Sequence, residues 1–168
     1  MSLSISEFKA KLISGARPNL FKVEIGELGA NLAFLCKATE LPGSNIGEIE
    51  VPYQGRSLKV AGNRTFDNWE ITVINDVNFD IHNRLIAWMD SINAHEGNTG
   101  GGDLASYMRD GAVIQLGRDG QEIKRYDFKD IWPSVVAPLP LDWASNDELE
   151  EFQCTFTIGS FWASEQTS

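Results

Sequence analysis

The stretch from Val60 to His95 limits the fold most, because its hydrophobic period changes once, from two residues to nearly four. Trp69, Ile71 and Val73 alternate with polar residues, which is the pattern of a strand with one buried face. After Asn75-Asp76, apolar residues recur at helical spacing: Ile81, Leu85, Trp88, Met89 and Ile92. The sequence therefore predicts a strand, a tight turn and an amphipathic helix that lies on a sheet, with Trp69 and Trp88 in the core.

Local signals mark the ends of this helix. Asn78 is a candidate N-cap, and Asp80 suits the positive end of the helix dipole. Arg84 follows Asp80 by four residues, the spacing of an ion pair on an exposed helix face. His95 and Gly97 suit the C-terminal end. The main helix is therefore expected between Asn78 and Gly97.

The rest of the chain is rich in strand patterns. They cover residues 21–25, 32–38, 48–53, 58–60, 113–116, 122–132 and 152–158. Asp119-Gly120 between two of these runs is the strongest hairpin signal, and Pro52 favours a strand end or an edge. We therefore predict an α+β, mainly β fold: an antiparallel β-sandwich or partial barrel with one main α-helix. Strand edges that remain unpaired in such a fold must be covered by another element or by another chain.

The chain is expected to be one domain over residues 1–168. Residues 1–16 are predicted to be an N-terminal arm, and 159–168 a C-terminal tail. Residues 40–61 have little apolar content and are expected to form a hairpin that projects from the core.

The charge balance argues against a nucleic-acid-binding protein. The chain carries 24 acidic and 14 basic residues, a formal net charge of −10, which repels phosphates. No apolar run reaches the ~18 residues of a membrane span, and the N-terminus has no signal-peptide core. We expect a protein that is assembled in the cytoplasm and not inserted in a membrane.

Motifs for catalysis or metal binding are weak. His82 and His95 lack a metal-site partner, and Gly100–Gly102 lacks the lysine and strand of a phosphate-binding loop. Cys36 and Cys154 lie in strand patterns and are expected to be small buried hydrophobes. We therefore expect no enzyme, no cofactor and no metal.

Three tryptophans lie beside prolines, turns or the tail. Trp143 and Trp162 are candidates for partner-facing residues, since aromatic side chains at chain irregularities can fill a neighbour's pocket. For Trp132 the alternative is a core position. The alternative for Trp143 and Trp162 is also a core position.

Four segments carry a family resemblance. They are ARPNLFKVEIGELG (16–29), FLCKATELPG (34–43), VAGNRTFDNWEITVINDVNFD (60–80) and WPSVVAPLPLDWASNDELEEFQCTF (132–156). In this order and spacing the chain resembles the tail tube proteins of T-even-type contractile-tailed bacteriophages, within the wider family of contractile injection system tubes.

The resemblance implies a structural virion protein. It implies six-membered rings in which each subunit adds inner strands to a ring-wide β-barrel, and rings that stack into a rigid tube. The implied partners are other copies of the chain, the tail sheath protein, the tape-measure protein, the baseplate or tube initiator, and the tail terminator. Genomic DNA would pass through the bore without specific binding.

Residue assignments follow from this resemblance. The inter-ring interface is predicted at Leu41, Pro42, Ile46, Ile49, Val51 and Tyr53. The bore or the seams between subunits are predicted at Glu48, Glu50, Arg125, Asp127 and Lys129. Ordinary core positions for Ile49 and Val51, and a plain solvated face for the charged residues, remain the alternatives.

Two other functions remain open on the residues alone. One is a tube or tube-initiator protein of a related secretion or injection system, with no DNA in the bore. The other, from a different class, is a monomeric β-sandwich that binds a sugar or small ligand through exposed tryptophans. Electron microscopy separates them, because only a tube protein forms rings.

Overall fold

The fold is seen in a computed structural model that describes residues 5–7, 9, 18–94, 96–97, 100, 103–146 and 148–166. Its elements are β1 (Phe21–Ile25), η1 (Gly26–Leu28), α2 (Leu32–Leu35), β2 (Cys36–Glu40), β3 (Ser44–Tyr53), β4 (Arg56–Phe66), β5 (Trp69–Ile74), α3 (Asp80–Ile92), α4 (Leu104–Tyr107), β6 (Arg109–Leu116), β7 (Glu122–Val136), β8 (Glu151–Ile158) and β9 (Trp162–Gln166). The predicted fold class is confirmed: antiparallel strands dominate and α3 is the main helix. Most of the predicted N-terminal arm, like His95, lies outside the described residues.

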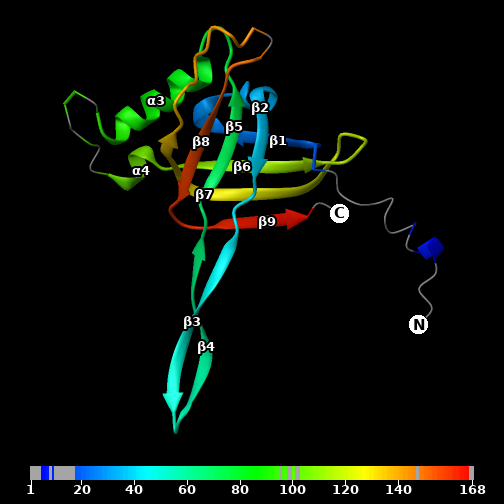
Figure 1. Ribbon diagram of the computed structural model, residues 1–168, viewed down its shortest axis with the longest axis vertical. Coiled ribbons are helices and arrows are strands. Elements are labelled where there is room, and N and C mark those ends of the chain that lie inside the picture. The colour runs from blue at the N-terminus through cyan, green and yellow to red at the C-terminus, as the bar shows by residue number, and fades with distance from the viewer. Residues whose placement is uncertain are drawn as a thin grey trace.

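One long strand, β7, connects two parts of the main sheet. The sheet order is β1-β6-β7-β8-β5-β2, and β9 also pairs with β7. The first part of β7 pairs with β6 and β9, while the part from Ile131 onward pairs with β8. Between these parts Asp130 has a φ of 56°, and the register with β6 shifts. The sheet therefore bends here, and β6, β7 and β9 run across the direction of β5 and β8 (Figure 1).

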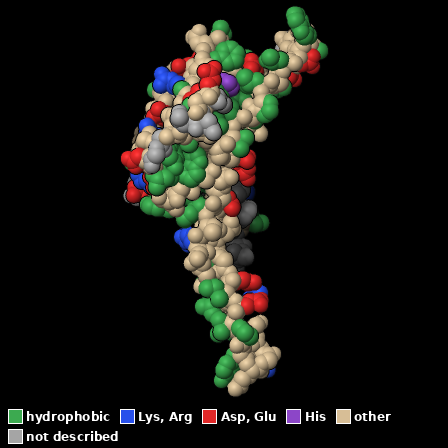
Figure 2. Space-filling view, turned by 90° about the vertical axis from the view of Figure 1, so that its left-hand side faces the viewer, with side chains coloured by type: hydrophobic (Ala, Val, Ile, Leu, Met, Phe, Trp, Pro, Cys, Tyr) green, Lys and Arg blue, Asp and Glu red, His purple; other side chains and the backbone are tan. Residues whose placement is uncertain are grey.

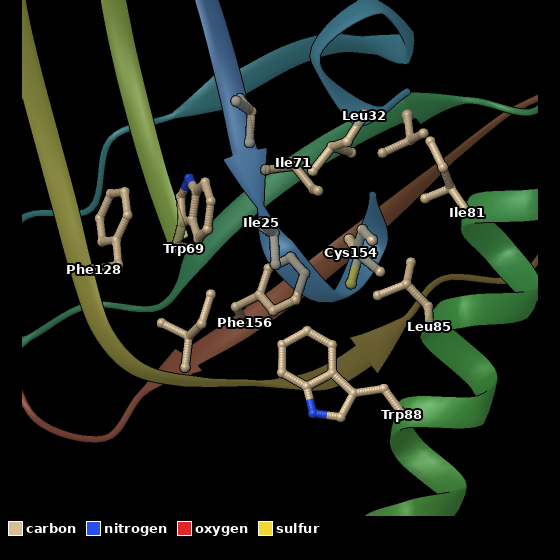
Figure 3. Close-up of a cluster of buried hydrophobic side chains, with 14 of the residues drawn as sticks. Ile25, Leu32, Trp69, Ile71, Ile81, Leu85, Trp88, Phe128, Cys154 and Phe156 are labelled. Atoms are coloured by element: carbon tan, nitrogen blue, oxygen red, sulfur yellow. The ribbon is translucent and has the colours of Figure 1, made fainter. Parts of the chain in front are cut away.

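The bent sheet encloses an aromatic cluster. Trp69 of β5 stacks on Phe128 of β7 with ring centroids 4.4 Å apart, and Phe156 of β8 lies 5.4 Å from Trp69. The indole N–H of Trp69 donates to Thr39 Oγ1 at 2.9 Å, so its polar atom is satisfied. Figure 3 shows Trp88 of α3 pointing into the same cluster. The prediction that Trp69 and Trp88 are core residues is confirmed, since both are buried.

Gly111 of β6 lies against this cluster and leaves no room for a side chain. A Cβ at this position would lie 3.0 Å from Ile131 Cδ1, 3.1 Å from Trp69 Cζ3 and 3.2 Å from Ile25 Cγ1. We expect Gly111→Ala to lower the free energy of unfolding by about 1–3 kcal/mol, the usual cost of overpacking a core. Urea unfolding of the two proteins measures the difference. The matched control is Gly26→Ala, where the added Cβ meets nothing within 4 Å.

The main helix α3 packs its predicted apolar side on the sheet. Its buried residues are Ile81, Leu85 and Trp88. The predicted pair is present, with Arg84 Nε 3.2 Å from Asp80 Oδ1. The predicted N-cap at Asn78 is wrong. Phe79 holds that position with a φ of 54°, and Asp76 Oδ1 accepts from the Asp80 N–H at 3.0 Å, so the cap comes from further upstream.

Two predicted element boundaries are corrected by the structure. Residues 32–35 form a helical turn and not the start of a strand, because i,i+3 spacing brings Leu32 and Leu35 to the core while Phe34 points to solvent. The predicted C-terminal tail includes the strand β9, which pairs with β7 between Lys124 and Phe128. Neither short segment has a sequence pattern that decides its partner.

The strands β3 and β4 form a separate two-stranded sheet that projects away from the body (Figure 1). Their pairing runs from Ser44↔Phe66 to Tyr53↔Arg56, so the hairpin extends beyond residue 61. Gln54 and Gly55 in the turn both have positive φ values, 47° and 80°, as a two-residue type I′ turn requires.

Candidate functional site

The projecting hairpin exposes a row of apolar side chains, so the expectation that residues 40–61 have little apolar content is wrong. Strand alternation and the cross-strand pairs Ile49↔Val60 and Val51↔Leu58 place one set on a single face. This apolar hairpin face consists of Ile49, Val51, Tyr53, Leu58 and Val60, whose exposed fractions range from 46% to 71%. Figure 2 shows hydrophobic side chains gathered along the projecting hairpin at the lower end of the molecule. A contiguous exposed apolar patch of this kind marks a protein–protein contact.

The predicted inter-ring residues fall in two places along the hairpin. Ile49, Val51 and Tyr53 lie on the apolar hairpin face, and Ile46 is exposed before a bulge in the pairing. Leu41 and Pro42 instead line a small hollow at the hairpin base, where Pro42 is buried within the subunit.

Sequence reasoning missed two members of the apolar hairpin face, Leu58 and Val60. The signal that could have found them is the two-residue turn Gln54-Gly55, which fixes the register and so the residues opposite Val51 and Ile49.

The opposite face of the hairpin is charged. Lys59 Nζ lies 2.9 Å from Glu48 Oε1 and 3.8 Å from Glu50 Oε1. All three side chains are more than half exposed. The hairpin is therefore two-sided, with a charged face that water can solvate and an apolar face that it solvates poorly.

A second charged group, the charged ladder, crosses β1, β6 and β7. It consists of Lys22, Glu24, Asp110, Glu122, Arg125, Asp127 and Lys129. Arg125 Nε lies 2.9 Å from Asp127 Oδ1, and Lys129 Nζ lies 2.7 Å from Asp110 Oδ2. The hydrogen bond that Arg125 donates to Asp127 raises the pKa of Arg125. Of the five predicted bore or seam residues, three lie here and two, Glu48 and Glu50, lie on the hairpin.

The Lys129–Asp110 pair predicts a pH dependence of stability. The hydrogen bond from Lys129 holds the pKa of Asp110 below its usual value. A carboxyl whose pKa is lower in the folded state stabilises above its unfolded pKa of about 3.9, and that contribution disappears as the pH falls through the folded pKa. We expect Asp110→Asn to lower the urea midpoint slightly at pH 7 and by less at pH 2. An equal difference at both values would contradict this origin.

The two tryptophans predicted to face a partner have different environments. Trp143 is fully exposed, at 101%. Trp162 is half-buried and lies edge-on to Phe66 and Tyr126, with ring centroids 6.1 and 6.2 Å away. It also lines the hollow beside Leu41. Trp143 is thus free to meet a partner, while Trp162 mainly anchors the hairpin base to the sheet.

Three strands of the main sheet have an unpaired edge within the described part of the chain: β1, β2 and β9. Unpaired edges expose backbone N–H and C=O groups that can pair with another chain. These edges and the apolar hairpin face are surfaces of the subunit that another protein chain can cover.

The titratable residues offer little reactive chemistry. Burial raises the pKa of the Cys36 thiol to about 11 and that of Cys154 to about 12, so both remain protonated near neutral pH. Within the described ranges, no three His, Cys, Asp or Glu side chains are grouped to hold a metal ion. None of the helices described there is long and apolar enough to span a membrane.

Comparison with known proteins identifies the family. Residues 4–164 match the family model described as phage tail tube protein. The chain is 43% identical over 149 residues to the tail tube protein gp19 of Enterobacteria phage T4, covering 88% of this chain and 90% of the relative. It is 32% identical over 124 residues to the tail tube protein of Serratia phage KSP90, covering 74% and 70%.

A solved structure shares the fold. The sheath–tube complex of the PVC extracellular contractile injection system, in its extended state, contains a chain that superimposes with a TM-score of 0.67 at 14% identity, covering 99% of this chain and 100% of that one. Because the family model spans nearly the whole sequence and the phage T4 relative matches most of it, this chain belongs to the phage tail tube protein family and is a structural protein of the virion tail.

Proposed function

We propose that this chain assembles into six-membered rings that stack to form the rigid inner tube of a contractile phage tail. The observation that carries the proposal is the apolar hairpin face, which projects from the body and which a lone subunit leaves in water. Ring closure would pair the free edges of the main sheet in a ring-wide β-barrel. A head-to-tail contact along the axis would give an open stack of rings.

The proposed tube is the conduit for genomic DNA, which passes without specific binding. Support comes from the charge state of the chain. Its net charge is −10, and the cations of the charged ladder are paired: Lys22 with Glu24, Arg125 with Asp127, and Lys129 with Asp110. A cation that already pairs with a carboxylate is less available to neutralise a DNA phosphate. A bore lined by the charged ladder or by Glu48 and Glu50 would therefore adsorb DNA weakly.

The proposed partners follow from the family. The inner tube would contact the tail sheath on its outside and the tape-measure protein in its bore. A baseplate or tube initiator and a tail terminator would bind its two ends. The PVC structure of the same fold is a sheath–tube complex, which supports a sheath partner for this chain.

Negative-stain electron microscopy of the purified protein at rising concentration tests the proposal. We expect rings, and tubes of constant diameter and variable length. A protein that remains a single subunit at millimolar concentration, and that is missing from purified phage tails, would refute the tube function.

A further inference from the structure

The end of the molecule opposite the hairpin carries a second exposed apolar surface. The connection between β7 and β8 lies at the top of the long axis in Figure 1, and the hairpin lies at the bottom. In this distal loop, defined as residues 137–146 and 148–150, Leu141, Trp143 and Leu149 are 84%, 101% and 74% exposed. A lone subunit therefore presents large apolar side chains to water at both of its ends.

The two ends also differ in charge. The distal loop borders a groove of about 490 Å³ lined by Pro140, Leu141, Ser145 and Leu149, with acidic side chains beside them. Those acidic residues are Asp142, Glu148, Glu150 and Glu151, of which Glu151 is paired with Lys37 at 2.7 Å. The hairpin over residues 44–66 has two acidic residues and three basic ones, so it is net positive on a chain of net charge −10.

We propose that the apolar hairpin face of one subunit docks on the distal loop of a second copy in the next ring, with Tyr53 and Arg56 at the groove beside Leu141. This inference rests on the proposed tube function and names the surface that receives the hairpin. Apolar area at each end would be removed from water, and opposite charges would favour this orientation over hairpin against hairpin.

Symmetry supports a contact between unlike surfaces. A hairpin that docked on another hairpin would make an isologous contact, which closes after two rings. A hairpin that docks on the distal loop leaves a free hairpin at one end and a free distal loop at the other, so the stack can grow. The placement of the two surfaces at opposite ends of the long axis meets this requirement (Figure 1).

Photo-crosslinking tests which surface receives the hairpin. The full chain with Tyr53→p-benzoylphenylalanine is assembled into tubes, irradiated and digested with trypsin and with a protease that cleaves after glutamate. We expect the main inter-subunit crosslink to join residue 53 to the peptide of residues 130–148, which contains most of the distal loop and none of the charged ladder. A main crosslink to another hairpin or to the charged ladder would overturn the inference, and the tubes themselves would leave the tube function standing.

A double variant, Leu141→Ser with Trp143→Ser, gives an independent test. Both side chains are exposed, so the urea midpoint of the subunit is expected to stay unchanged while tube number falls at least tenfold. Leu104→Ser on α4, also exposed, is the matched control and should assemble normally. Normal tubes from the double variant would overturn the docking site, whereas a wild-type chain without tubes would refute the proposed function itself.

Discussion

Replacement of residues 49–60 by Asn-Gly is expected to abolish tubes and leave a folded subunit. Glu48 pairs with Ala61, so a two-residue turn can join them without a change of register. Every residue of the removed segment is exposed, so the core loses no contact. A loss of about 1.4 kcal/mol of binding free energy weakens one contact between subunits tenfold. Because all subunits of a ring bind the next ring at once, the losses at their contacts combine. Electron microscopy measures the number of tubes, and urea unfolding measures whether the shortened subunit is still folded.

The design of this variant depends on the pairing of the hairpin. A deletion of residues 44–55 would remove all of β3 and leave β4 without its partner, which confuses misfolding with lost contact. The control is Leu104→Ser, an exposed position on α4 outside the hairpin, which should leave tube number unchanged. Tubes of normal length from the shortened variant would show that the hairpin does not hold adjacent rings together.

Trp69→Ala is expected to lower the free energy of unfolding by about 4 kcal/mol, the usual cost of removing a large buried aromatic side chain. Trp69 stacks on Phe128, contacts Phe156 and donates to Thr39, so the change leaves a cavity and an unsatisfied hydroxyl. At 168 residues, the melting temperature should fall by roughly 10 °C. Urea unfolding and calorimetry of the subunit measure both quantities.

Trp143→Ala is the matched control, because the same substitution is made at a fully exposed position. We expect its unfolding free energy to lie within about 0.5 kcal/mol of the wild type. A comparable loss of stability in both variants would show that Trp143 is covered in the subunit, and would remove it from the exposed surface of the distal loop.

Strong local periodicity made much of the fold predictable. The change from strand to helix after Ile74, the Asp119-Gly120 hairpin and the alternation of β8 were all predicted and are confirmed. Each of these segments is long enough for its period to repeat, so a single structure satisfies the pattern. The face of α3 that packs on the sheet followed in the same way.

Short segments were less predictable. The four residues of α2 fit a strand or a helical turn equally well, and β9 is a strand because β7 offers it an edge. The strand register that the hairpin turn sets places Leu58 and Val60 on the apolar hairpin face. In each case the deciding contact is with residues elsewhere in the chain.

The sequence by itself determined the mainly β fold, the buried tryptophans and the family, because these depend on local period and on the order of whole segments. Only the tertiary structure decided which surfaces remain uncovered. It bends β7 at Asp130, pairs the hairpin on itself and places the distal loop at the other end of the molecule. Exposure of a side chain depends on which distant strands cover it, and that is a property of the packed chain.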